Sequence, residues 1–198
     1  MRRFGGRPYK SDRSNTPKLI LGFGALILLA LAGLTIWLDW PTVGIPEGGV
    51  AGQRIKITAG AIYSARFADT EGNEQVLGQW QHQLLILNFW ATWCAPCKEE
   101  MPMLARTQQN LGHKGVQIVG IGVDSRENVV KFAQKYPVGY PLLPDEARAV
   151  EFSRRLGNHL GLLPFTVAIR PGGDVVYTRI GRVPQAELVN IIDENTLK

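Results

Sequence analysis

Two largely apolar runs stand out in the pattern of hydrophobic and polar residues, at 84–90 (LLILNFW) and 116–123 (VQIVGIGV). Runs of this length and β-forming composition are typical of strands that are buried on both faces. Two further apolar stretches, 165–170 and 175–180, flank the turn residues Pro171-Gly172-Gly173-Asp174. This arrangement predicts a β-hairpin near the C-terminus.

Four segments have the periodicity or end signals of helices: 95–111, 128–136, 145–156 and 184–196. The first has Pro96 in its first turn and Pro102 as an expected kink, and the third opens with acids that suit a helix dipole. Upstream, 62–67 alternates weakly and 69–73 is a turn. The element order β-α-β-α-α-β-β-α predicts an α/β fold, in which helices cover both faces of a mixed central sheet.

The longest apolar run, 19–38, contains no charged residue. Twenty helical residues at ~1.5 Å each span a ~30 Å hydrocarbon core, so we expect one transmembrane helix. The cations that precede it place the N-terminus in the cytoplasm and the rest of the chain outside. A cleaved signal peptide stays an alternative, because Ala30-Leu31-Ala32 resembles a cleavage site, although the polar leader is long for one.

The chain therefore divides into a basic leader at 1–18, a transmembrane anchor at 19–38, a linker at 39–60 and a folded domain at 61–198. Within the Pro- and Gly-containing linker, 54–58 could form a short strand. The leader holds six Lys and Arg residues and one Asp, which accounts for the whole net charge of +5. The folded domain is consequently neutral, so we expect no nucleic-acid partner.

The only two cysteines form the motif Cys94-Ala95-Pro96-Cys97, where the strand at 84–90 gives way to the helix at 95–111. Two cysteines are too few for a disulfide framework, and the spacing indicates redox, metal or haem chemistry. Unpaired N–H groups and the dipole at a helix N-terminus favour a thiolate. We therefore predict that Cys94 attacks and that the deeper Cys97 resolves the mixed disulfide.

Other uses of the cysteine pair fit less well. Haem attachment requires a histidine directly after the second cysteine, where Lys98 stands. A structural zinc site needs two more ligands, and the three histidines (His82, His113 and His159) are scattered without ligand spacing. A purely structural disulfide is disfavoured, because a strand-to-helix junction exposes and activates a thiol. We expect no metal site and interpret the histidines as surface or structural residues.

The segment FWATWCAPCKEEMP at 89–102 resembles the active site of the thioredoxin superfamily. The approach NFWATWC and the Lys-Glu-Glu after the second cysteine resemble its TlpA-like branch. That branch consists of bacterial membrane-tethered thiol-disulfide oxidoreductases and includes the cytochrome c maturation reductases. The resemblance covers 61–198, and it implies a thioredoxin fold, two catalytic cysteines and no bound cofactor.

A second stretch at 161–166 (GLLPFT) is similar to the G-x-P-x-T-like segment of the family, with one extra residue. The resemblance implies that Pro164 is a cis-proline facing the cysteines and that the Leu163 backbone hydrogen-bonds an extended substrate peptide. The alternative is an ordinary trans proline that opens an edge strand. Next to the cysteines, Trp93, Ala95 and Pro96 are expected to contact substrate.

The chain departs from ordinary thioredoxins at Asn88, where those proteins resemble one another in a buried aspartate that assists the second cysteine. Asparagine cannot accept a proton at neutral pH. Glu100 lies three residues after Cys97 on the same helix face, and TlpA-like proteins have a functional glutamate at that spacing. Glu100 is therefore a candidate base, with a solvated surface position as the alternative, and Glu99 is expected at the surface.

The function expected from these features is reduction of protein disulfides outside the cytoplasm, in a bacterial periplasm or its equivalent. The Ala95-Pro96 dipeptide supports this direction, because it lacks a histidine cation that would make the disulfide strongly oxidising. Candidate substrates include apocytochrome c, copper-chaperone cysteines and general protein disulfides. The resemblance implies an integral-membrane thiol donor as reductant.

Two other functions remain open. A peroxiredoxin-type peroxidase would have a T-x-x-C nucleophile motif, whereas Thr92 lies only two residues before Cys94. A redox-inactive peptide-binding or assembly module would use the thioredoxin groove without turnover.

Overall fold

The computed structural model describes residues 57–196. The predicted leader and anchor, and the predicted linker up to residue 56, lie outside these residues, as does most of the candidate strand at 54–58. Within the described part of the chain, no helix has the length and apolarity needed to cross a membrane.

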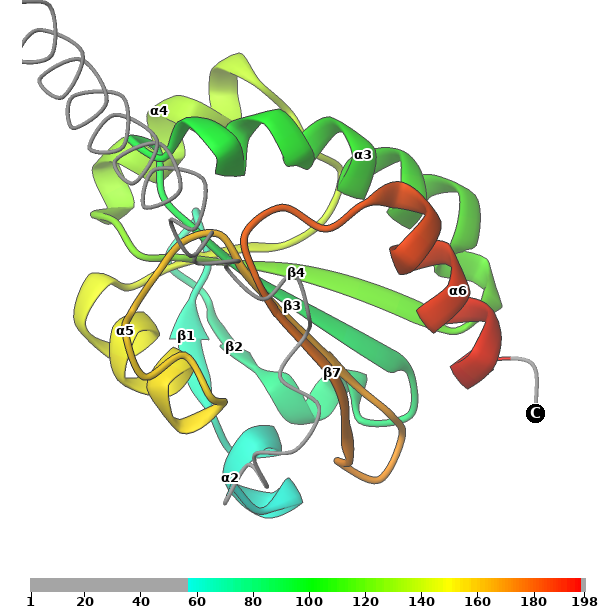
Figure 1. The fold of residues 1–198 in the computed structure, drawn as a ribbon. Coiled ribbons are helices and arrows are strands. Elements are labelled where there is room, and N and C mark those ends of the chain that lie inside the picture. The colour runs from blue at the N-terminus through cyan, green and yellow to red at the C-terminus, as the bar shows by residue number, and fades with distance from the viewer. Residues whose placement is uncertain (1–56, 197–198) are drawn as a thin grey trace, which may run out of the picture. The chain divides into compact units, whose positions relative to one another are not determined.

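The described residues form the predicted helices and strands in the predicted order, together with shorter pieces that the sequence pattern did not indicate (Figure 1). The elements are α2 (Ala59–Tyr63), β1 (Arg66–Ala68), β2 (Glu74–Val76), η1 (Leu77–Trp80), β3 (Leu84–Trp90), α3 (Ala95–Leu111), η2 (Gly112–Lys114), β4 (Val116–Gly122), α4 (Arg126–Lys135), β5 (Leu142–Pro144), α5 (Glu146–Arg155), β6 (Phe165–Ile169), β7 (Val175–Ile180) and α6 (Gln185–Thr196).

A five-stranded mixed sheet in the order β5-β4-β3-β6-β7 forms the centre of the fold. β3, β4 and β5 run parallel, whereas β6 is antiparallel to β3 and β7 is antiparallel to β6. β3 is central and every residue in it is buried, as its largely apolar sequence predicts. The predicted mixed α/β sheet is confirmed.

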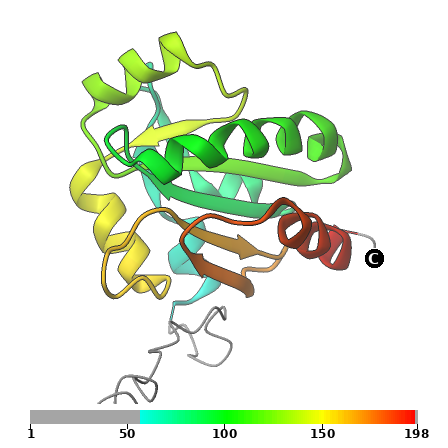
Figure 2. The same cartoon turned by 45° about the horizontal axis from the view of Figure 1, so that its top comes forward.

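The helices cover both faces of this sheet (Figure 2). On one face, α3, α4 and α6 pack on alternate β3 residues, with Met101, Val129 and Leu188 in the core. On the other face, α5 and the small β1–β2 sheet pack on the remaining β3 residues through Phe67 and Phe152. The two cores are separated by the sheet, since successive strand residues point to opposite sides.

The strong sequence signals gave accurate bounds, and the weak ones did not. β3, α3 and β7 match their predicted ranges, and the other long elements differ by at most two residues at an end. The weakly alternating stretch at 62–67 is part helix and part strand, because Thr58 caps α2 and that helix runs to Tyr63. β5 was not predicted, since it has three residues and ends at Pro144.

Candidate dithiol active site

The two cysteines lie at the end of central strand β3 and the start of α3, as the sequence predicts. They are joined by a disulfide, with 5.3 Å between their Cα atoms. Cys94 is the N-cap of α3, and its Sγ accepts a hydrogen bond from the Cys97 N–H at 3.3 Å. Cys94 is 6% exposed and Cys97 is fully buried. A helix N-terminus that already directs an N–H at the Cys94 sulfur would stabilise a thiolate there once the pair is reduced.

Glu100 is buried beneath the active-site helix, with 2% of its surface exposed, so the alternative of a solvated surface position is wrong. Its Oε1 accepts a hydrogen bond from Asn88 Nδ2 at 2.7 Å, and its Oε2 accepts one from the Val183 N–H at 3.1 Å. Burial raises the pKa of Glu100 above its usual range, and the hydrogen bonds from Val183 and Asn88 offset that rise only in part. This carboxyl is therefore tuned to hold a proton more readily than an ordinary glutamate.

Glu99 differs from Glu100 in both its exposure and its partners. Its side chain is exposed and forms a surface ion pair with Arg182 at 2.8 Å. The expectation that Glu99 belongs to the surface is confirmed. The adjacent glutamates thus offer a matched pair for experiment, with one carboxylate buried and the other solvated.

Asn88 connects the buried carboxylate to the central sheet. It lies in β3 opposite Thr166 of β6, and its Nδ2 donates to both Glu100 Oε1 and Thr166 Oγ1, the latter at 3.1 Å. Both amide hydrogens of Asn88 can therefore be used. One holds the Glu100 carboxylate, and the other joins Asn88 to β6. Sequence reasoning identified Asn88 as the residue in place of an aspartate, but it did not predict that Asn88 would hold Glu100.

Two further parts of this cluster carried no sequence signal. Tyr140 is buried, and its pKa is raised by burial and by the nearby charge of Glu100. The Val183 backbone amide comes from the segment before α6, more than eighty residues from Glu100. Both reach the site through tertiary packing alone, so no spacing rule could have found them.

Asp124 holds the loop that leads into the cysteines. It follows β4, and its Oδ2 accepts hydrogen bonds from the Thr92 N–H at 3.0 Å and from the Thr92 hydroxyl. Burial alone would raise the pKa of Asp124, but hydrogen bonds, chiefly from Thr92 and Asn128, hold it below the usual range. The sequence could have indicated Asp124 as a residue of the site, because Asp124 follows β4. The C-terminal ends of the parallel strands β3 and β4 meet at the same edge of the sheet.

The three residues beside Cys94 that are expected to contact substrate lie at the surface, whereas Trp90 lies in the core. Trp93 is 69% exposed, Ala95 and Pro96 are exposed, and Trp90 is fully buried in the core. These positions leave the first three available at the surface beside Cys94.

The predicted cis-proline is confirmed, because the Leu163–Pro164 peptide bond is cis. Phe165 pairs with Phe89 near the end of β3, which brings Pro164 to the sheet edge that carries the cysteines. The side chain of Asn158 exchanges two hydrogen bonds with the Leu162 backbone and so holds this loop.

No group of three or more His, Cys, Asp or Glu side chains among residues 57–196 is arranged to hold a metal ion. His82, His113 and His159 are exposed, as expected. Within the described residues, the titratable cluster next to the disulfide is the one around Glu100.

The sequence matches the AhpC/TSA family over residues 59–178, which include both cysteines and Pro164. This chain belongs to that family. The matched range begins at the first residue of α2 and ends within β7, so it spans nearly all of the sheet.

Individual relatives agree with this assignment. The chain is 31% identical over 153 residues to thiol-disulfide oxidoreductase ResA of Geobacillus thermodenitrificans, covering 76% of this chain and 79% of that protein. It is 34% identical over 119 residues to ResA of Bacillus subtilis, covering 60% of this chain but just under two thirds of that protein, 64%. The resemblance to the thioredoxin-like thiol-disulfide oxidoreductases is confirmed.

A solved structure supports the same fold. The thioredoxin-related protein from Neisseria meningitidis serogroup B is 32% identical, with a TM-score of 0.60, and the match covers 67% of this chain and 99% of that one. The folded part of the chain is therefore a thioredoxin-like domain.

Proposed function

We propose that this chain reduces disulfide bonds of other proteins outside the cytoplasm by dithiol exchange through Cys94 and Cys97. The observation that carries this proposal is the pairing of a disulfide at a helix N-terminus with a buried carboxyl, Glu100, on the following turn. The named thiol-disulfide oxidoreductases among its relatives support the same activity.

The first step is attack by the Cys94 thiolate on one sulfur of the substrate disulfide. The substrate S–S bond breaks, a mixed disulfide forms with Cys94, and the other substrate sulfur leaves as a thiolate. The N–H of Cys97 and the helix dipole stabilise the attacking thiolate before the step.

The second step is attack by Cys97 on the Cys94 sulfur. Cys97 must first lose its proton, and we assign that proton to Glu100, directly or through one water molecule. The bond between Cys94 and the substrate breaks, the substrate leaves as a dithiol, and the Cys94–Cys97 disulfide remains. Asn88 and the Val183 amide keep the accepting carboxylate in place.

Substrate would bind across the exposed surface beside the cysteines. Trp93, Ala95 and Pro96 would contact it on one side, and the Leu163 backbone at the cis-proline would hydrogen-bond an extended peptide on the other. None of the backbone hydrogen bonds within residues 57–196 uses Leu163. Apocytochrome c or another extracytoplasmic protein is the proposed substrate.

The proposed location follows from the apolar run at 19–38 and the basic leader before it, which suit a single-pass anchor in the bacterial inner membrane with a cytoplasmic N-terminus. A reductant in an oxidising compartment must be recharged, and we propose an integral-membrane thiol donor. Fractionation tests this: the intact chain should be in the membrane pellet, whereas a mature protein that starts at Gly33 would establish a cleaved signal peptide.

The direct test of the activity is reduction of insulin by the full-length protein. Wild type should turn over, Cys94→Ser should abolish turnover, and Cys97→Ala should accumulate as a mixed disulfide with substrate. Absence of turnover in the wild type would indicate a redox-inactive binding module. Rapid peroxide consumption that exceeds disulfide reduction would instead indicate a peroxidase.

A further inference from the structure

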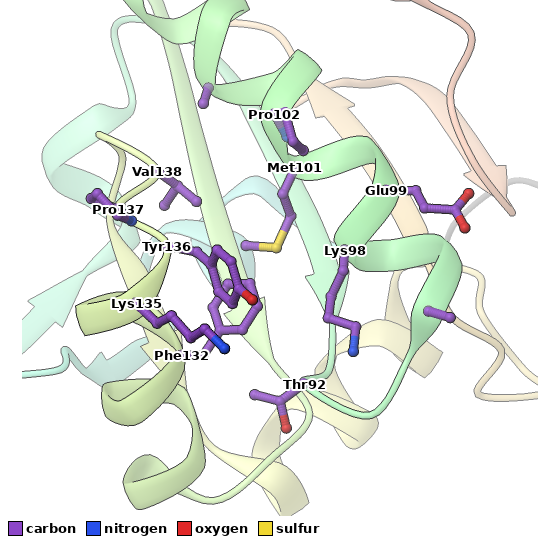
Figure 3. Close-up of a pocket in the computed structure, with 12 residues that line it drawn as sticks. Thr92, Lys98, Glu99, Met101, Pro102, Phe132, Lys135, Tyr136, Pro137 and Val138 are labelled. Atoms are coloured by element: carbon purple, nitrogen blue, oxygen red, sulfur yellow. The ribbon is translucent and has the colours of Figure 1, made fainter.

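A groove lies beside the disulfide, between α3 and the end of α4, and of the proposed substrate-contacting residues it includes only Ala95 (Figure 3). Its volume is about 840 Å³. Apolar side chains from both elements line it, chiefly Met101, Phe132, Tyr136 and Val138. Thr92 and Ala95 line the end nearest the cysteines. This size and lining are typical of sites that take an apolar group.

Two cations lie at that same end of the groove. Figure 3 shows the amines of Lys98 and Lys135 directed toward the Thr92 end. Both side chains are exposed, and neither forms a salt bridge with any residue in 57–196. The Lys135 amine lies 5.3 Å from the centre of the Tyr136 ring.

The acid that lines the groove does not neutralise these cations. Glu99 points away from the apolar floor in Figure 3, and its carboxylate pairs with Arg182. Asp124 accepts hydrogen bonds from Thr92, Ser125 and Asn128, and no salt bridge joins its carboxylate to Lys98 or Lys135. The groove therefore presents an apolar floor and, at one end, two lysines that have no salt-bridge partner among the described residues.

We propose that this groove docks a segment of the partner protein in which an apolar side chain lies next to a carboxylate. The apolar side chain would pack between Met101 and Phe132, and the carboxylate would lie by Lys98 and Lys135. Because Thr92 and Ala95 flank Cys94, the docked segment would lie within a few residues of the substrate cysteine whose sulfur Cys94 attacks. The inference rests on the proposed dithiol exchange and names a class of substrate for it.

The charge arrangement favours this partner. An apolar groove alone would accept any hydrophobic segment, but two unpaired lysines at one end attract acidic segments and repel basic ones. The groove also lies on the α4 side of the cysteines and includes neither Leu163 nor Pro164. A substrate could therefore bind Leu163 through backbone hydrogen bonds and the groove through its side chains.

Capture of designed peptides tests the proposal with full-length Cys97→Ala protein. The probes are disulfide-linked dimers of acetyl-ELGCGLE-amide, of its lysine counterpart acetyl-KLGCGLK-amide, and of acetyl-ESGCGSE-amide. Attack by Cys94 releases one peptide thiol and leaves the other in a mixed disulfide, which mass spectrometry measures over time. We expect the acidic apolar peptide to be captured about three- to tenfold faster than the other two, with the margin over the basic peptide shrinking at high salt.

Charge reversal supplies the decisive comparison. Lys98→Glu combined with Lys135→Glu should reverse the preference between the acidic and basic peptides. Lys114→Glu combined with Lys131→Glu changes the net charge equally on exposed residues outside the groove, and it should keep the wild-type preference. The ratio of the two capture rates within each variant cancels any effect of Lys98 on the thiol itself.

Four results would overturn the inference. If the wild-type protein captures the acidic and basic peptides at equal rates, the groove does not select the substrate. The same holds if the Lys114/Lys131 variant changes its preference as much as the Lys98/Lys135 variant. In both cases the proposed function stands. Dimerisation of the wild type that the groove variant abolishes would assign the groove to a second copy of the chain. No mixed disulfide with any peptide would overturn the proposed function as well.

Discussion

The two faces of the central strand β3 have opposite character. One face points into an apolar core and carries Leu85, Leu87 and Phe89. In this core the ring centres of Phe89 and Phe152 are 6.1 Å apart. On the other face, Asn88 stands among apolar neighbours and holds the carboxylate of Glu100 beneath the disulfide. We call these the apolar face and the active-site face.

This difference teaches what each side of the sheet contributes. The apolar face stabilises the fold by burial and aromatic contacts, which have no role in thiol chemistry. The active-site face includes a buried carboxyl, and burying such a group is unfavourable unless hydrogen bonds compensate. Asn88 and the Val183 amide provide that compensation, so this face is arranged for chemistry at some expense of stability.

The largest expected effect is loss of stability from the apolar face. Phe152→Ala removes a buried ring that contacts Phe67 and Phe89, and it should lower the free energy of unfolding by about 3–5 kcal/mol. Urea denaturation of the oxidised protein measures this. Below the transition, the reactivity of reduced Cys94 should be unchanged, and a large change in that reactivity would show that the two faces are coupled.

The next effect concerns the active-site face. Glu100→Gln keeps the size and the acceptor for the Val183 N–H but removes the base, so resolution of a model mixed disulfide should slow by up to about 100-fold. Stopped-flow measurement from pH 6 to 9 follows that step. Because the pKa of Glu100 is raised, the wild-type rate should also fall as acid protonates this carboxylate.

Glu99→Gln is the matched control, since it changes the neighbouring carboxylate at the surface and breaks only the exposed ion pair with Arg182. Its resolution rate should equal that of the wild type. If the Glu100 variant also resolves at the wild-type rate over the whole pH range, water reaching Cys97 is the better account.

The smallest effect is a pH dependence of stability. The folded pKa of Glu100 is raised above that of the unfolded chain, so as pH rises past about 4.5 the unfolded state loses this proton first. Stability from this group therefore falls with rising pH, until the folded carboxyl also ionises. The stability of Glu100→Gln relative to wild type should increase between pH 4 and 7, which denaturation midpoints measure. If the difference in stability between the variant and the wild type does not depend on pH, the raised pKa is contradicted.

The sequence predicted those parts of the fold whose signals are local. A largely apolar run predicted β3, and a proline in the first turn helped to predict α3. β5 was not predicted because its three residues, which follow Pro141 and end with Pro144, are too few to show a periodic pattern. Strands that short form because a neighbouring strand, here β4, offers hydrogen-bond partners.

The candidate site shows the same limit. The cysteine spacing and the helix N-terminus identified Cys94 and Cys97, and the i+3 spacing placed Glu100 on the same helix face. The hydrogen bond from Asn88 to Glu100 depends on how α3 lies across β3, which no local pattern encodes. Tyr140 comes near the Glu100 carboxyl from a loop for the same reason, through packing of segments distant in sequence, and no hydrogen bond joins the two.

The central claim is that the two sulfurs are chemically unequal, with Cys94 as the nucleophile and Cys97 buried behind it. Alkylation of the reduced full-length protein with a limiting amount of iodoacetamide, followed by peptide mass spectrometry, measures this directly. The account predicts that Cys94 is modified well before Cys97, because it is at the helix N-terminus and is the less buried of the pair. Faster modification of Cys97 would contradict the account.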